Sequence, residues 1–187
     1  MHRFSPENWQ RLENASRYEL LPPEKILRGF GLKKGMSFVD VGAGTGFFSR
    51  AAAQIVGESG KVFALDVSQQ MIETLQELGV TEQVKVFRSK EYEIPLQDSV
   101  ADMTWLAFVT HENPDVPRLV REAARITTEG GKIVIVEWKK QDEEMGPPMH
   151  ERLGQDTLKG ELKEFRLKGE GSLNSSHYYI EIEVKKP

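Results

Sequence analysis

The sequence predicts an α/β fold with one mostly parallel sheet and helices on both of its faces. Short β-branched apolar runs alternate with helical patterns along the middle of the chain, which is typical of βαβ units. A glycine-rich loop joins the first run to the first helical pattern. The last strong run, GKIVIVEW, is almost uninterrupted, as expected for a strand that is buried on both faces.

Five strands and three helices are expected in the central part of the chain. The strands are residues 36–41, 61–67, 84–87, 101–109 and 131–138, and the helices are residues 47–56, 69–78 and 116–126. Ser68 can cap the second helix, because its hydroxyl can accept a bond from a backbone N–H at the first turn. Gly79 suits the left-handed conformation that often follows the end of a helix.

The flanking segments are less regular. Residues 5–30 carry two helical patterns separated by Pro22 and Pro23, so we expect either a helix packed on one face of the sheet or a lid over a ligand. GPPMHERLG predicts a loop, because two adjacent prolines do not fit a helix interior. A short helix at residues 155–164 and an antiparallel hairpin over residues 165–187 are expected to follow.

Composition limits the class of protein. For 187 residues we expect one domain, residues 1–187, with residues 1–30 as its N-terminal helical segment. No apolar run reaches the roughly 20 residues of a membrane helix, and the polar N-terminus has no secretory signal, so a cytoplasmic protein is expected. The formal net charge of −4 disfavours a nucleic-acid partner and favours a small-molecule one, while a homodimer stays open. The absence of cysteine excludes thiolate metal sites and a cysteine nucleophile.

The glycine loop lies in the stretch FVDVGAGTGFFS. A dinucleotide-binding loop reads G-x-G-x-x-G, and Gly42 and Gly44 fit that pattern. The third glycine comes early, at Gly46, and Phe47 stands where the pattern needs a small residue. Asp40 would repel a pyrophosphate but attract an ammonium group. The loop therefore favours a ligand that carries positive charge.

S-adenosylmethionine meets this requirement, because it bears an ammonium group and a sulfonium and has no phosphate. Asp66 ends the second predicted strand, 20 residues after Gly46, where a carboxylate can accept hydrogen bonds from both ribose hydroxyls. Strand, glycine loop, helix, strand and aspartate occur where open α/β sheets bind ligands. We therefore predict S-adenosylmethionine as the cofactor.

The sequence resembles the class I S-adenosylmethionine-dependent methyltransferases over nearly its whole length. VDVGAGTGFFS is similar to the family's first motif, ALDVSQQM to the acidic second, IPLQDSVADMTWLAFVTHE to the segment into the fourth strand, and ARITTEGGKIVIVEW to the helix, turn and fifth strand. Among small members it resembles the ubiquinone and menaquinone C-methyltransferases. The resemblance implies a Rossmann-like, doubly wound sheet of seven strands in the order 3-2-1-4-5-7-6, with strand 7 antiparallel.

The resemblance also implies a set of cofactor-binding residues. They are Asp40, Gly42, Ala43, Gly44, Gly46, Asp66, Val67, Lys90, Glu91 and Leu106. The first five lie at the methionyl moiety, Asp66 at the ribose and Val67 against the adenine. The family often places an aspartate near the adenine amino group, but Lys90 stands at the matching position here and cannot accept that bond. Glu91 or backbone groups are the alternatives.

Methyl transfer from a sulfonium is an in-line displacement, so the protein mainly aligns the acceptor and excludes water. His111 follows the fourth strand and is the candidate general base, with a structural role at the strand end as the alternative. Glu112 and His150 are secondary candidates, and no metal site is expected, because these residues lack the spacing of metal ligands.

The predicted function is transfer of a methyl group to carbon, oxygen or nitrogen of a small molecule. A catalytically silent cofactor-binding scaffold and an NAD(P)-dependent oxidoreductase are the alternatives. Because arsenite methyltransferases bind arsenic through thiolates, the lack of cysteine excludes that substrate. Six aromatic residues can line an acceptor pocket: Phe4, Trp9, Tyr18, Trp105, Phe108 and Tyr178. Of these, Trp105 and Phe108 are expected in the core, because they lie in or beside the fourth strand.

Overall fold

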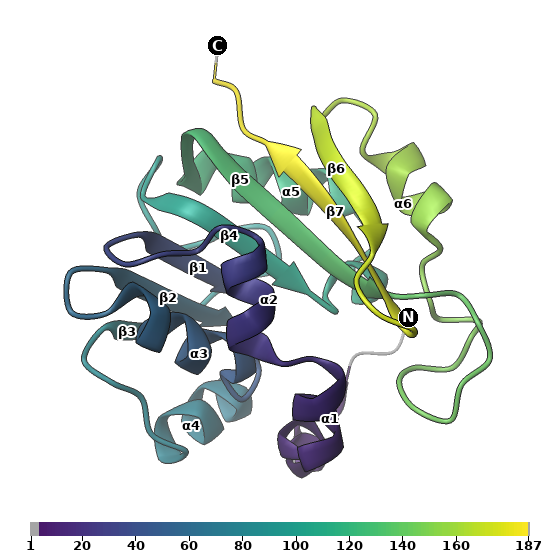
Figure 1. The fold of residues 1–187 in the computed structure, drawn as a ribbon, viewed down its shortest axis with the longest axis horizontal. Coiled ribbons are helices and arrows are strands. Elements are labelled where there is room, and N and C mark those ends of the chain that lie inside the picture. Colours follow the sequence, from purple (N-terminus) through teal and green to yellow (C-terminus); the bar gives the residue numbers. More distant parts are fainter. Residues whose placement is uncertain (1–3, 187) are drawn as a thin grey trace.

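A computed structural model describes residues 4–186 and contains one seven-stranded sheet in the order β3-β2-β1-β4-β5-β7-β6 (Figure 1). The strands are β1 Ser37–Val41, β2 Lys61–Asp66, β3 Val84–Arg88, β4 Ala101–Ala107, β5 Thr127–Trp138, β6 Leu167–Ser172 and β7 His177–Glu183. The first five are parallel to one another, and β7 is antiparallel to both β5 and β6. The predicted strand order and the antiparallel seventh strand are confirmed.

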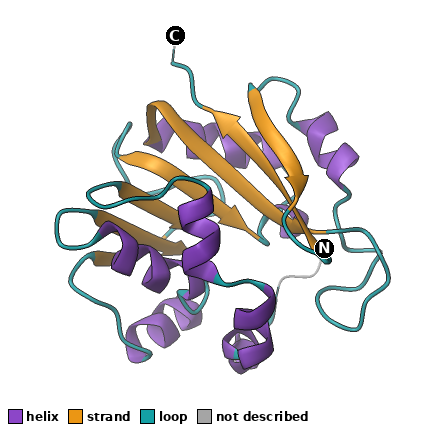
Figure 2. Ribbon diagram, viewed as in Figure 1, coloured by secondary structure: helices purple, strands orange, loops and turns teal. Residues whose placement is uncertain are grey.

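Helices cover both faces of this sheet (Figure 2). They are η1 Pro6–Glu13, α1 Ala15–Leu20, α2 Pro23–Gly29, α3 Phe47–Val56, α4 Gln69–Glu77, η2 Thr110–Glu112, α5 Val116–Ile126 and α6 Gln155–Glu161. Alternate strand residues point to opposite faces, so Phe38 joins the core beneath α2 and α3 and Val39 joins the core beneath α5. The sheet is therefore the middle of three layers.

Most element boundaries match the sequence patterns. The Ser68 hydroxyl accepts a hydrogen bond from Met71 N at 3.3 Å, and Gly79 has φ 86°. The start of β5 is a correction, because it begins at Thr127 rather than at residue 131. The Thr127 hydroxyl donates to the carbonyl of Ala123 at 2.7 Å and lies 2.7 Å from the hydroxyl of Thr104. These bonds end α5 and carry the chain directly into the strand.

The N-terminal segment divides into two parts. In α2, Ile26 and Leu27 are buried in the core, as expected of a packing helix. In Figure 1, α1 lies off the edge of the sheet towards which the β4 arrow points. Glu13 binds Arg50 of α3 at 2.6 Å, which fixes η1 to the helix behind the glycine loop. Residues 1–3 of the predicted segment lie outside the described residues, and no helix within residues 4–186 is long and apolar enough to span a membrane.

Candidate active site

The glycine loop leaves β1 between its two neighbours, β2 and β4, where the strand order reverses. Ligands of open α/β sheets bind at such a point, outside the carboxyl ends of the strands. Gly42, Gly44 and Gly46 all have left-handed backbones, with φ of 73°, 55° and 81°. A methyl group at Gly46 would overlap the side chain of Leu75, so both backbone angle and space require glycine there.

Asp66 braces this loop from the end of β2. One carboxylate oxygen accepts a hydrogen bond from Gly44 N at 2.9 Å and the other accepts one from Ser68 N at 2.8 Å. The side chain is buried. The loop and the predicted ribose-binding carboxylate thus meet in one place.

Asp40 lies in β1, directly before the loop. Its carboxyl group is buried and accepts a hydrogen bond from the Ser49 hydroxyl at 2.6 Å. Burial raises the pKa of Asp40 to about 7, against the opposing effects of the Ser49 bond and of Arg17. The negative charge of Asp66 adds to the increase. A cation placed here would favour the ionised carboxylate.

Arg17 of α1 is a site residue that the sequence patterns did not identify. Its guanidinium carbon lies 4.3 Å from the ring centre of Phe47 and 5.9 Å from that of Phe108. One guanidinium nitrogen, Nη1, donates a hydrogen bond to the carbonyl of Leu12 at 2.8 Å. Burial lowers the pKa of Arg17 to about 10. The charges of Glu13 and Asp40 oppose this decrease, although no ion pair joins Arg17 to a carboxylate within residues 4–186. A half-buried charge is stabilised by a partner of opposite charge, so Arg17 is suited to bind an anionic group.

A cleft of about 540 Å³ opens beside the end of β2. It is lined by Val67, Arg88, Ser89, Lys90 and Glu91. Three of the predicted cofactor-binding residues therefore share one cleft. The ammonium of Lys90 is bound to Glu93 at 2.6 Å.

His111 lies in η2, just after β4, and is held by Glu137 at the end of β5. The imidazole Nδ1 lies 2.9 Å from one Glu137 oxygen and 3.0 Å from the other, and His111 N donates to Glu137 at 3.1 Å. Burial disfavours protonation of the ring, but the Glu137 carboxylate outweighs it and raises the pKa of His111. Glu137 is fully buried, and despite that burial the His111 contact holds its pKa below the ordinary value. A carboxylate that orients a histidine in this way increases its basicity.

The other sequence candidates differ in their surroundings. Glu112 Oε1 lies 3.9 Å from His111 Nε2 and accepts a hydrogen bond from Phe4 N at 2.8 Å, whereas His150 is 80% exposed and lies 3.9 Å from Glu151. Leu106 is completely buried in the core beneath α5 and is not among the residues that line the cleft. Among the described residues, no group of three or more His, Asp or Glu side chains is placed to hold a metal ion.

Of the aromatic candidates, Trp105 and Tyr178 are core residues, as buried side chains on opposite faces of the sheet. Phe108 is partly buried and packs against the same core as Trp105, and its ring centre lies 5.9 Å from the guanidinium of Arg17. It has φ 62°, an uncommon backbone conformation for a bulky residue that often marks functional sites.

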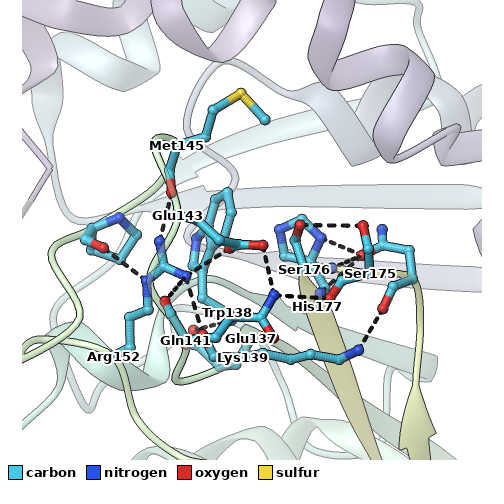
Figure 3. Close-up of polar contacts among 12 residues, drawn as sticks. Glu137, Trp138, Lys139, Gln141, Glu143, Met145, Arg152, Ser175, Ser176 and His177 are labelled. Carbon is cyan, nitrogen blue, oxygen red and sulfur yellow. Dashed lines mark hydrogen bonds and ion pairs between the residues drawn. The ribbon is translucent and has the colours of Figure 1, made fainter.

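The loop after β5 is fixed by Arg152 (Figure 3). The guanidinium binds Glu143 at 2.7 Å and donates to the carbonyls of Lys139, Gln141, Met145 and Pro147. It also lies 5.1 Å from the ring centre of Trp138. The proline-rich loop is therefore held in one conformation against the end of β5.

The assembled groups suit a ligand with both charges. The Asp40 carboxyl group, with its pKa raised to about 7, lies on β1, and the Arg17 guanidinium, which has no ion pair within residues 4–186, lies over the first residue of α3. An α-amino acid moiety carries the matching ammonium and carboxylate. Asp66 and the cleft beside it extend the site towards β3.

Comparison with known proteins agrees with this geometry. Residues 39–135 match the family model described as "Methyltransferase domain". The crystal structure of an S-adenosylmethionine-dependent methyltransferase from Aquifex aeolicus is 32% identical, with a TM-score of 0.92 over 97% of this chain and 100% of that one. A putative type 11 methyltransferase from Sulfolobus solfataricus is 22% identical, with a TM-score of 0.72 over 89% of this chain and 93% of that one, and shares the fold.

Curated relatives match over a shorter length. A demethylmenaquinone methyltransferase from Staphylococcus aureus is 29% identical over 134 residues, which are 70% of this chain and 56% of that protein. A ubiquinone/menaquinone biosynthesis C-methyltransferase from Haemophilus ducreyi is 28% identical over 114 residues, 59% of this chain and 44% of that protein. The chain thus spans about half the length of these relatives. With its fold, its family match and the Aquifex structure taken together, the chain belongs to the class I methyltransferases and its cofactor is S-adenosylmethionine.

Proposed function

We propose that this protein transfers the methyl group of S-adenosylmethionine to a small-molecule acceptor by in-line displacement. The observation that carries the proposal is the pair of opposite charges at the glycine loop. Asp40 would bind the ammonium of the methionyl group and Arg17 its carboxylate. Asp66 would bind the ribose hydroxyls, and Val67 and Glu91 would flank the adenine in the cleft beside β2.

The acceptor side of the site is proposed to use His111 as the base. The acceptor would give its proton to His111 Nε2, and an electron pair of the acceptor atom would form the new bond to the methyl carbon. The electrons of the broken carbon–sulfur bond stay on sulfur, which leaves S-adenosylhomocysteine. Glu137 holds Nδ1 and so presents Nε2 to the acceptor. The names of the curated relatives support a small, aromatic acceptor such as a quinol.

Two measurements test this function. Calorimetry with S-adenosylhomocysteine and with NAD should give binding of the first and none of the second, whereas the reverse result would overturn the proposal. Labelled S-adenosylmethionine incubated with a metabolite extract should then give a labelled small molecule. Tight binding without any transfer would support a silent cofactor-binding protein instead.

Asp66→Ala should weaken S-adenosylhomocysteine binding about 100-fold, because two hydrogen bonds to a charged group are lost, each contributing about 1.5 kcal/mol or more. The variant also loses the bonds to Gly44 N and Ser68 N, so its thermal stability should fall while it still folds. Calorimetry below the melting temperature measures the first effect. Asp142→Ala, on an exposed loop carboxylate, is the control and should bind like the wild type. An Asp66→Ala protein with unchanged affinity would remove this residue from the site.

Binding should also become stronger as pH rises from 5 to 8. Because the pKa of Asp40 is raised to about 7, its carboxyl group carries a proton at pH 6, and a bound ammonium group would displace this proton. The pH dependence of folding has the opposite sign. A raised carboxyl pKa contributes stability that is complete below about pH 4 and is lost as pH rises through 7. Calorimetry at pH 6 in two buffers of different ionisation enthalpy should detect proton release. Asp40→Asn should abolish this release, and a wild-type protein that releases no proton would contradict the assignment.

A further inference from the structure

His177 is a buried histidine that neither the sequence patterns nor the proposed mechanism uses. It begins β7 and pairs with Trp138, the last residue of β5, so it lies at the same edge of the sheet as the glycine loop. Its ring centre is 4.2 Å from that of Trp138 and 5.1 Å from that of Phe108, and Figure 3 shows it beside the Trp138 and Glu143 side chains. Its side chain is completely buried.

The hydrogen bonds of Asn174 fix the tautomer of this ring. Asn174 Oδ1 accepts bonds from Ser176 N at 2.9 Å and His177 N at 2.8 Å, and these backbone groups can only donate. The same oxygen lies 2.9 Å from His177 Nδ1, so Nδ1 must carry the proton. The other ring nitrogen, Nε2, therefore carries a lone pair.

That lone pair has no partner within residues 4–186. Unpaired buried polar atoms are rare in proteins and cost free energy. Burial lowers the pKa of His177 to about 4, although Glu143 and Glu137 favour its protonation, while Arg17 and Arg152 oppose it. The ring thus stays neutral at physiological pH, and Nε2 is available as a hydrogen-bond acceptor.

The surroundings connect this nitrogen to the cofactor site. Phe108 contacts His177 and also lies 5.9 Å from the guanidinium of Arg17, which we place at the methionyl carboxylate. Asn174 Nδ2 donates to the carbonyl of Leu20 at 2.9 Å, so the end of α1 lies over the cluster. Phe108 and Asn174, which both contact His177, are therefore in contact with α1, and Trp138 lies on the side of the ring where Arg152 holds the loop after β5.

We propose that His177 Nε2 is the hydrogen-bond acceptor of a methyl-acceptor subsite formed with Phe108 and Trp138, which opens when α1 moves away from Asn174. This subsite takes an aromatic molecule that presents an O–H or N–H donor. The inference rests on the proposed methyltransferase function. It assigns the binding and selection of the acceptor to His177 and leaves proton removal to His111.

Phenol and anisole are suitable probes, because both are small aromatic molecules but only phenol has a donor. Each is titrated into the protein labelled with 15N-histidine, in the presence of S-adenosylhomocysteine. The His177 signals are assigned by through-bond correlation in the wild-type protein. We expect an Nε2 signal typical of an unprotonated ring nitrogen, which phenol shifts saturably and anisole does not. His177→Phe should weaken phenol binding at least about tenfold, whereas His150→Phe, at an exposed histidine, should not.

Three results would overturn the inference: a proton on Nε2, no shift with phenol, or the same shift with both probes. Because the wild-type signals carry the test, it does not depend on whether His177→Phe folds. Calorimetry with S-adenosylhomocysteine separates the two proposals. Absence of cofactor binding counts against the proposed function, whereas a protein that binds cofactor but gives no phenol response overturns only the role of His177.

Discussion

Arg17→Met is expected to weaken S-adenosylhomocysteine binding about 100-fold and to leave the binding of 5′-methylthioadenosine unchanged. The first ligand carries the methionyl carboxylate and the second lacks it. A charge-assisted bond to a half-buried guanidinium contributes up to about 3 kcal/mol, which corresponds to a factor of about 100. Methionine keeps the length of the side chain and its packing against Phe47. Calorimetric titration of both ligands measures the difference.

The two ligands make this test specific. If Arg17 only supported the fold of α1, both affinities would fall together, and the proposed carboxylate contact would be wrong. Arg11→Met is the matched control, because Arg11 is an exposed arginine in the same N-terminal segment. It should bind both ligands as the wild type does. The comparison also reports on α1, since a cofactor contact from this helix would couple ligand binding to closure of the segment.

The central features of the fold were predictable because they are local in the sequence. Gly42, Gly44 and Gly46 are the positions of the loop with left-handed backbones, and such a need is visible in the residue types themselves. The parallel strands were predictable because each is a short β-branched apolar run that is visible in the local sequence. The order of the last strands came from the family resemblance, because pairing between β5 and β7 has no local signal.

The groups missed by the sequence analysis owe their role to distant partners. Arg17 is notable only because folding brings it over Phe47 without an ion pair to any carboxylate of residues 4–186. In the sequence, Glu137 is a single charged residue in an apolar strand. Its role depends on contact with His111, which is 26 residues earlier in the chain. His177 is likewise ordinary until Asn174 fixes its tautomer. Contacts of this kind are set by topology and not by periodicity, so no sequence pattern predicts them.

Glu137→Ala should lower the free energy of unfolding by about 3–5 kcal/mol, the usual effect of removing one partner from a buried ion pair. Glu137 is fully buried and accepts bonds from the Thr110 hydroxyl, His111 N and Trp138 N as well as facing the imidazole. Denaturant unfolding at pH 7 measures the loss. Glu164→Ala breaks the exposed pair with Arg121 and should lower the free energy of unfolding far less, because solvent screens exposed ion pairs. A similar small effect at Glu137 would show that the pair contributes little.

Glu137→Gln tests the chemistry of the pair apart from its stability, because the amide keeps the shape and one acceptor oxygen. The Glu137 charge raises the pKa of His111, so NMR titration of the imidazole should give a lower value in the variant. The raised pKa contributes stability that is complete below about pH 6.5 and is lost as pH rises through the folded-state pKa. The depressed pKa of Glu137 contributes stability that is lost as pH falls through its own folded-state value. The stability that this pair contributes should therefore be greatest between the unfolded-state pKa values of glutamate, about 4.3, and histidine, about 6.5. In Glu137→Gln, the free energy of unfolding should depend less on pH on both sides of this range. A variant that keeps the wild-type pH profile would show that His111 is set by other groups, and a base oriented by Glu137 would then be the wrong description of this site.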